Sequence, residues 1–162
     1  MSSRYLDLVL LDENADRAEW HRITLEGDTA FERARDVAEK MPQPGWYEAH
    51  GVYLCAIERP FSRSRNDVVR LVQGCVLASI PSSLDVWEVA PQTWKAHIGF
   101  KGRGKPTQGQ FAGFTFDGFT PSWRSASNAG DWPQDALDAL GAALWARDTN
   151  ADLVARALGG AA

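Results

Sequence analysis

Three carboxylates have the types and spacing to do chemistry together. Asp135 and Asp138 stand three positions apart at the start of a predicted helix, so both project from one helix face. Glu58 ends the apolar run 52–57, which predicts a buried strand, and sites in open α/β sheets form at the carboxyl ends of strands. Helix capping and the helix dipole explain an isolated acidic pair equally well. A glutamate at a strand end is also often simply turned to water.

Small residues along the same helix favour one pocket for the three acids. Positions 139, 141, 142, 143 and 146 are alanine or glycine, which lets the helix lie close against a sheet and brings its aspartates toward Glu58. Converging carboxylates repel one another unless cations neutralise them, and oxygen ligands without thiolate or imidazole select Mg²⁺ or Mn²⁺. One such ion activates water and a second stabilises a leaving oxygen, which is the chemistry of phosphodiester hydrolysis.

The charge distribution leaves room for a nucleic-acid partner. The net charge of −4 and the pI near 5.3 by themselves argue against one. However, residues 91–116 contain four cations and no acid, and residues 59–70 contain four arginines against one aspartate. Because the local field decides where a polyanion docks, two basic patches on an acidic body can bind phosphates. The alternative is a pair of solvated loops.

Length and composition predict one domain over residues 1–162, with 44% hydrophobic residues to build its core. The longest stretch without charge, residues 71–84, is interrupted by polar residues, glycine and proline, so we expect no membrane span. The first thirty residues lack the apolar core of a secretory signal, and the expected location is the cytoplasm.

Cys55 and Cys75 lie in apolar runs and are expected to be buried thiols rather than metal ligands.

Alternating strand and helix patterns predict a mixed sheet flanked by helices. The glycine-rich segment 99–130 is expected to be an irregular surface excursion, and residues 148–162 a frayed helix or a disordered tail. The remaining elements are predicted from apolar spacing, caps and prolines. They are a hairpin of strands 5–11 and 18–25, helix 28–42, strand 51–57, helix 64–80, strand 85–89, a short helix opened by Pro91, and helix 133–147.

Three motifs, in this order, give the chain a resemblance to a known family. They are Ala-Ile-Glu at 56–58, Trp-Glu-Val-Ala-Pro at 87–91 leading into Lys95 and a glycine-basic loop, and Asp-Ala-Leu-Asp-Ala-Leu at 135–140. Together they resemble the RuvC family of Holliday junction resolvases, with the ribonuclease H-like fold, in its bacteriophage and actinobacterial variants. The likeness covers about residues 2–147. It implies a magnesium-dependent endonuclease that cuts four-way or branched DNA as a homodimer in the bacterial cytoplasm.

The resemblance also assigns roles to individual residues. Glu58, Asp135 and Asp138 would be catalytic carboxylates that hold two Mg²⁺ or Mn²⁺ ions. Phe61 would stack on bases at the junction crossover, and the helix 64–80 would supply the dimer face. The implied contacts to DNA are Phe61, Arg63, Arg65, Lys95, Lys101, Arg103 and Lys105.

The chain departs from the family pattern at two places. The family begins with a strand of the form apolar-Gly-Ile-Asp, whose aspartate is the first metal ligand, whereas Ser3-Arg4 and the strand 5–11 match the family's next segment, after that aspartate. We therefore expect the first, central strand to be absent, Met1 to be an internal methionine, and this chain to have weak or no activity. Asp7 is a poor substitute, because Leu6 and Leu8 assign it to the opposite face. The second departure is 111–128, where glycines and aromatics replace a lysine-bearing helix.

Two other functions remain open at this point. A non-catalytic junction-binding module would be consistent with a missing metal ligand, and it would leave DNA intact with every metal. Another ribonuclease H-like nuclease would act on flaps or on RNA/DNA hybrids. A comparison of branched DNA with an RNA/DNA hybrid as substrate separates this second nuclease from a junction resolvase.

Overall fold

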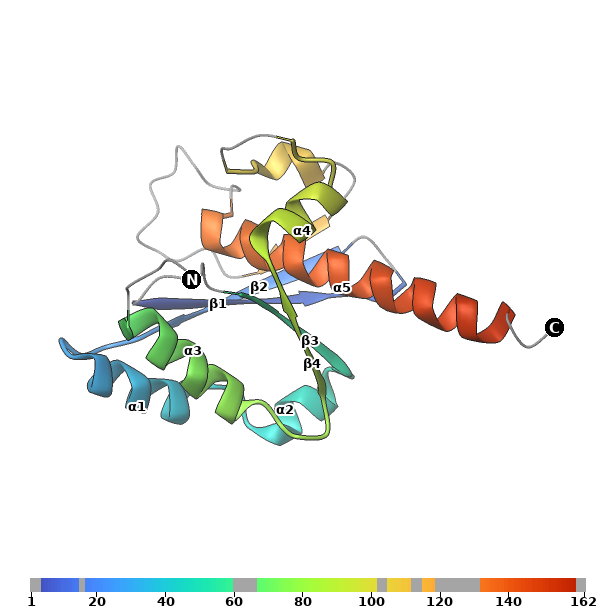
Figure 1. Ribbon diagram of the computed structural model, residues 1–162. Coiled ribbons are helices and arrows are strands. Elements are labelled where there is room, and N and C mark those ends of the chain that lie inside the picture. Colours follow the sequence, from blue (N-terminus) through green and yellow to red (C-terminus); the bar gives the residue numbers. More distant parts are fainter. Residues whose placement is uncertain are drawn as a thin grey trace.

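The computed structural model describes residues 4–14, 17–59, 67–101, 105–111, 115–118 and 132–159, and it shows a mixed α/β arrangement (Figure 1). The strands are β1 (Tyr5–Leu11), β2 (Arg17–Thr24), β3 (Leu54–Glu58), β4 (Asp85–Val89) and β5 (Thr115–Gly118). The helices are α1 (Ala30–Lys40), α2 (Pro44–Ala49), α3 (Asp67–Ser79), α4 (Pro91–His97) and α5 (Gln134–Gly159), with a short 3₁₀ helix at Gln108–Phe111.

The five described strands form two separate sheets rather than one. β1 and β2 make the predicted antiparallel hairpin, in which Tyr5 lies opposite Thr24 and Leu11 opposite Ala18. β5 adds to β2 in parallel, and β3 pairs in parallel with β4. Within the described ranges no strand joins β1 to β3. The predicted mixed sheet is therefore present as two parts.

Helices cover both faces of these two sheets. α5 contacts β1 and β3, so one helix lies across both sheets, while α1 and α3 contact each other on the opposite side (Figure 1). One core cluster lies toward α1 and α3 and includes Leu6, Ile57 and Val76. A second lies against α5 and includes Trp20 and Leu140. None of the described helices is both long and apolar enough to cross a membrane.

Elements with strong local signals lie where the sequence predicts them. α1 begins with a capping box, in which the Thr29 hydroxyl accepts from the Glu32 amide and the Glu32 carboxylate accepts from the Thr29 amide. The helix ends at Lys40, just before Pro42, as expected. β4 has the predicted bounds, and Pro91 opens α4. The predicted helix 64–80 is present as α3; its first residues, with the predicted cap Ser64, lie outside the described residues.

Two predictions about the second half of the chain are wrong. The segment 99–130 is not irregular throughout, because Thr115–Gly118 forms β5 along the free edge of β2, where pairing with a neighbour outweighs a glycine-rich local sequence. The helix predicted to end near Arg147 continues to Gly159. Residues 148–150 are only weak helix formers, each costing less than about 0.7 kcal/mol relative to alanine, and no proline stops the helix there.

A glycine on α5 allows α4 to approach closely. The Trp94 side chain of α4 is fully buried, and a Cβ atom built on Gly141 would lie 2.3 Å from its Cε3 atom. We expect Gly141→Ala to lower the free energy of unfolding by about 1–3 kcal/mol, because the ring has no room to retreat. Gly74→Ala in α3 is the matched control, since a Cβ there meets nothing within 4 Å. It should raise stability by about 0.5–1 kcal/mol. Urea unfolding of both variants measures the difference, and equal effects would contradict this packing.

Candidate active site

Glu58, the last residue of β3, is held by an indole from α4. The Trp94 Nε1–H donates a hydrogen bond of 2.8 Å to Glu58 Oε2. The order of elements explains this contact, because β4 pairs alongside β3 and α4 starts two residues after β4 ends. Burial raises the pKa of the Glu58 carboxyl above its usual value; the bond from Trp94 opposes this rise, and the negative charge of Asp138 adds to it.

Asp138 reaches the same place from the second turn of α5. Its Oδ1 accepts a hydrogen bond of 2.7 Å from Gln134 Nε2, one turn earlier. Burial raises the pKa of the Asp138 carboxyl, the Gln134 bond and the charge of Lys95 lower it, and the charge of Asp135 raises it further. Glu58 and Asp138 form a half-buried acidic pair where α5 packs against β3. Among the described residues, the second oxygen of each carboxylate accepts no hydrogen bond.

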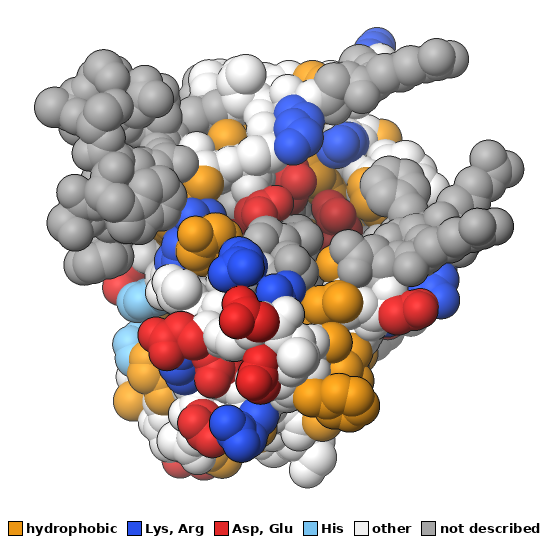
Figure 2. Space-filling model, turned by 90° about the vertical axis from the view of Figure 1, so that its left-hand side faces the viewer, with side chains coloured by type: hydrophobic (Ala, Val, Ile, Leu, Met, Phe, Trp, Pro, Cys, Tyr) orange, Lys and Arg blue, Asp and Glu red, His pale blue; other side chains and the backbone are white. Residues whose placement is uncertain are grey.

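Lys95 is the cation that acts on this acidic pair. Its charge lowers the pKa of both Glu58 and Asp138, and its Nζ lies 5.4 Å from the centre of the Trp94 ring. One helical segment therefore supplies both the indole donor and the positive charge. Lys101 and Lys105 are exposed. Figure 2 looks onto the end of the molecule where β3 ends and α5 begins, and it shows acidic side chains gathered on this face with lysine or arginine side chains above them.

The third predicted carboxylate, Asp135, lies near the other two, but the three are not arranged as a metal-binding site. Asp135 is half-buried in the first turn of α5, and its charge acts on Asp138. Among the described residues, no group of three or more Asp, Glu, His or Cys side chains is arranged to hold a metal ion. The structure thus brings Glu58 and Asp138 together, with Asp135 beside them.

The Asp7 carboxylate is occupied by hydrogen bonds within the hairpin, in agreement with the prediction that Asp7 is a poor metal ligand. Its carboxylate accepts hydrogen bonds from Trp20 Nε1 at 2.7 Å and from Arg22 Nε and Nη2 at 2.8 and 3.0 Å. Leu6, next to it, points into the other core. Asp7 therefore belongs to the hairpin and not to the acidic pair of Glu58 and Asp138.

The remaining predicted residues divide into two groups. Phe61, Arg63, Arg65 and Arg103 lie outside the described residues. Cys55 and Cys75 are free thiols that are half-buried rather than fully buried. Neither is part of a metal-binding group in the described part of the chain.

Sequence reasoning missed the two donors that hold the carboxylates. The apolar pattern places Trp94 inward without assigning it a polar partner, and it gives Gln134 no role. A signal for the first was present, because a buried indole N–H usually finds a hydrogen-bond partner and Glu58 is a polar strand end. Gln134 stands four positions before Asp138, a spacing at which side chains on one helix meet.

The raised pKa values of Glu58 and Asp138 predict that ionisation of these acids lowers the stability of the metal-free protein as the pH rises. A carboxyl whose pKa is higher in the folded than in the unfolded state contributes stability below its unfolded pKa, and this is lost as the pH rises through its folded pKa. Asp138→Asn keeps the acceptor for Gln134 and cannot ionise. In the presence of chelator it should be more stable than wild type at pH 7, and this advantage should shrink toward pH 4. Thermal unfolding at both pH values tests this; a wild type that is the more stable protein at pH 7 would contradict it.

Comparison with solved structures identifies one with the same architecture. A structure of RuvC from Thermus thermophilus superposes with a TM-score of 0.58 and 16% sequence identity, covering 91% of this chain and 89% of that chain. No protein-family model and no curated protein sequence matches the chain. At this level of identity the likeness shows the fold alone, and it confirms the RuvC-like architecture that the sequence motifs predict.

Proposed function

We propose that this chain, which has a RuvC-like fold, is a metal-dependent endonuclease that hydrolyses phosphodiesters of branched DNA, with Holliday junctions as its substrate. One observation carries the proposal. Glu58 and Asp138 are half-buried side chains from distant elements, the negative charge of Asp138 acts on Glu58, and the positive charge of Lys95 acts on both. Helix capping explains an acid near a helix start, but it does not explain why a second acid from a strand end is brought against it. Like charges that are drawn together out of water create a place for a cation.

The carboxylate oxygens of these acids are the ligand type that a hard divalent cation prefers. Its ligands would be the carboxylate oxygens of Glu58 and Asp138, with Asp135 beside them, and none of these three side chains is a thiolate or an imidazole. Such oxygen sets favour Mg²⁺ or Mn²⁺. When bound, two ions would activate the attacking water and stabilise the leaving oxygen. We propose that one more aspartate, from the first strand of the family pattern, completes the set.

The residues around the acids would keep them in place for this work. Trp94 fixes one oxygen of Glu58, and Gln134 fixes one oxygen of Asp138. The second oxygen of each carboxylate would remain available to bind the cation, and the two hydrogen bonds would limit how far either side chain has to turn when an ion binds. Lys95, whose charge acts on both acids, would bind the phosphate that is to be cut.

Contacts to DNA would extend from the acidic pair along the basic segments. We propose that Lys101, Arg103 and Lys105 continue the phosphate contacts of Lys95. Phe61 would stack on bases at the crossover, with Arg63 and Arg65 beside it. Two copies of the chain, meeting through the helix 64–80, would cut opposed strands of the junction. We place the protein in the cytoplasm of a bacterium, in the phage and actinobacterial branch of the family.

A comparison of substrates tests the proposal. A four-way junction, a linear duplex of the same sequence, a flap and an RNA/DNA hybrid are incubated with the protein, first in chelator to measure binding and then in Mg²⁺ or Mn²⁺ to measure cutting. The same assays are run on a form extended by the codons upstream of Met1. We expect preferred binding to the junction and metal-dependent cutting of it by the extended form.

Two results would overturn the proposal in favour of another function. Preferred cutting of the hybrid or the flap would identify a ribonuclease H-like nuclease of a different substrate class. Tight junction binding without cutting, by both forms and with either metal, would identify a non-catalytic junction-binding module.

A further inference from the structure

One buried side chain of α3 is polar, although the face on which it lies is apolar. Gln73 is only 5% exposed, and the other two buried residues of α3 are Val72 and Val76. Burial of an amide costs free energy unless the amide is hydrogen-bonded, whereas an apolar side chain of similar volume would fill the same space without that cost. Gln73 therefore calls for an explanation beyond packing.

The partner of this side chain is the main chain of Glu58. Gln73 Nε2 donates a hydrogen bond of 3.2 Å to the main-chain carbonyl oxygen of Glu58. The next amide along the chain, that of Arg59, donates a bond of 2.7 Å to the carbonyl oxygen of Val89 in β4. The C=O and N–H groups of a trans peptide point in opposite directions. The peptide unit that follows Glu58 is therefore held from two sides, by α3 and by β4.

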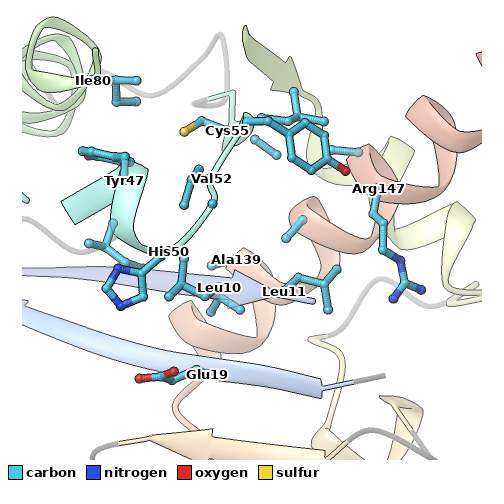
Figure 3. A pocket seen from close by; sticks show the side chains of 18 of the residues that line it. Leu10, Leu11, Glu19, Tyr47, His50, Val52, Cys55, Ile80, Ala139 and Arg147 are labelled. Carbon is cyan, nitrogen blue, oxygen red and sulfur yellow. The ribbon is translucent and has the colours of Figure 1, made fainter. Parts of the chain in front are cut away.

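Apolar packing leaves space beside this part of β3. Ile57, the residue before Glu58, belongs to the same core cluster as Val76 of α3. Both also line a cavity of about 540 Å³, several times the ~150 Å³ of an engineered apolar cavity in a protein core. Figure 3 looks into this cavity and shows Leu10 of β1 on one side and Cys55 of β3 on the other. Because apolar contacts are non-directional and do not fill this space, the hydrogen bond from α3 restrains the strand end in a way that packing does not.

We propose that Gln73 is a positioning residue for the acidic pair: its amide ties the end of β3 to α3 and thereby fixes where the Glu58 carboxylate stands relative to Asp138. Asp138 is placed by α5, so the distance between the two acids depends on where β3 ends. Trp94 holds Glu58 at its carboxylate, and Gln73 holds the same residue at its main chain. That this placement serves metal binding rests on the proposed function, whereas the tie between α3 and β3 does not.

Gln73→Met tests the proposal in the full chain. Methionine is unbranched and close to glutamine in length, but it has no N–H, so the variant keeps the packing of α3 and loses the donor. Val76→Ala is the matched control, because Val76 is buried three positions later on the same helix and packs in the same cluster as Ile57. This control loses apolar contacts only, and it should lower the midpoint of urea unfolding.

Hydrogen exchange in chelator measures whether the strand end is held. Nuclear magnetic resonance follows the Arg59 amide and the Trp94 indole N–H, whose bonds to Val89 and Glu58 depend on the position of this end. Amides of the β1–β2 hairpin serve as the internal reference. In Gln73→Met both protons should exchange faster by about tenfold relative to the hairpin, because opening of the strand end no longer breaks a bond to α3. The control variant should show no such selective change.

Calorimetry with Mn²⁺ measures what this placement does for the acids. The affinity should fall about 10- to 100-fold in Gln73→Met, the loss typical of groups that support a metal ligand. It should stay at the wild-type level in Val76→Ala. If the wild type itself binds no Mn²⁺, the proposed function fails, and hydrogen exchange in chelator still decides whether Gln73 holds the strand end.

Three results would overturn the proposal. The first is unchanged exchange of the Arg59 and Trp94 protons in a folded variant. The second is faster exchange with unchanged Mn²⁺ affinity, which would leave Gln73 a purely structural tie. The third is an equal loss of Mn²⁺ affinity in Val76→Ala, because a general loosening of α3 would then explain the effect. If Gln73→Met does not fold, Gln73→Asn is measured in its place, since its amide is one methylene short of the Glu58 carbonyl.

Discussion

In the form extended by the codons upstream of Met1, Glu58→Gln is expected to abolish metal-dependent cutting of a four-way junction, while junction binding in chelator stays at the level of the unsubstituted protein. The amide oxygen of glutamine can still accept the bond from Trp94 Nε1, so the local structure is retained. The variant loses one negative charge of the pair that would hold the cation. Loss of a residue that merely supports a metal ligand costs about 10- to 100-fold, so loss of a ligand should reduce cutting by more than about 100-fold.

Two measurements and a matched control make this result specific. Mn²⁺ affinity, measured by calorimetry, should fall together with cutting. Glu88→Gln is the control: Glu88 is an exposed acid on the neighbouring strand, and its carboxylate faces Arg59 at 3.3 Å. This variant should bind Mn²⁺ and cut as wild type does. A Glu58→Gln protein that cuts normally would show that the catalytic site lies elsewhere.

Asp7→Ala is expected to lower the free energy of unfolding by about 3–5 kcal/mol, because it leaves the Arg22 guanidinium buried without its carboxylate. The side chains of Arg22 and Asp7 are only 8% and 2% exposed. The Trp20 indole loses its acceptor in the same variant. Because Arg22 also lies over the rings of Tyr5 and Trp20, it cannot easily turn to water.

An exposed ion pair provides the comparison for this effect. Arg35 and Glu39 lie one helical turn apart in α1 at 3.8 Å, with side chains 75% and 65% exposed. Glu39→Ala should change stability by less than about 0.5 kcal/mol. Urea unfolding of both variants measures the two effects. A loss below about 1 kcal/mol for Asp7→Ala, well under the cost of breaking a buried pair, would mean that Arg22 finds another partner, and would contradict the burial of the pair.

Local signals were sufficient to predict much of the framework of this protein. The hairpin, α1 with its cap at Thr29, β4 and the helix opened by Pro91 arise from apolar periodicity, capping residues and prolines, which act over a few neighbouring residues. β5 was missed because pairing with a distant strand, not its own composition, makes it a strand. The same kind of local reasoning identified Glu58, Asp135 and Asp138 as candidate acids from their types and spacing.

Only the tertiary structure decided which side chains meet. The contact between Trp94 and Glu58 spans 36 positions of the sequence, and it exists because β4 aligns with β3 and Gly141 lets the indole lie on α5. The burial of the ion pair between Asp7 and Arg22 likewise depends on how helices and strands pack once they have formed. So does the division of the strands into two sheets with a cavity between them. Residue type and spacing determine what a segment can become, whereas contacts between distant segments are set by shape and burial in three dimensions, which no local pattern encodes.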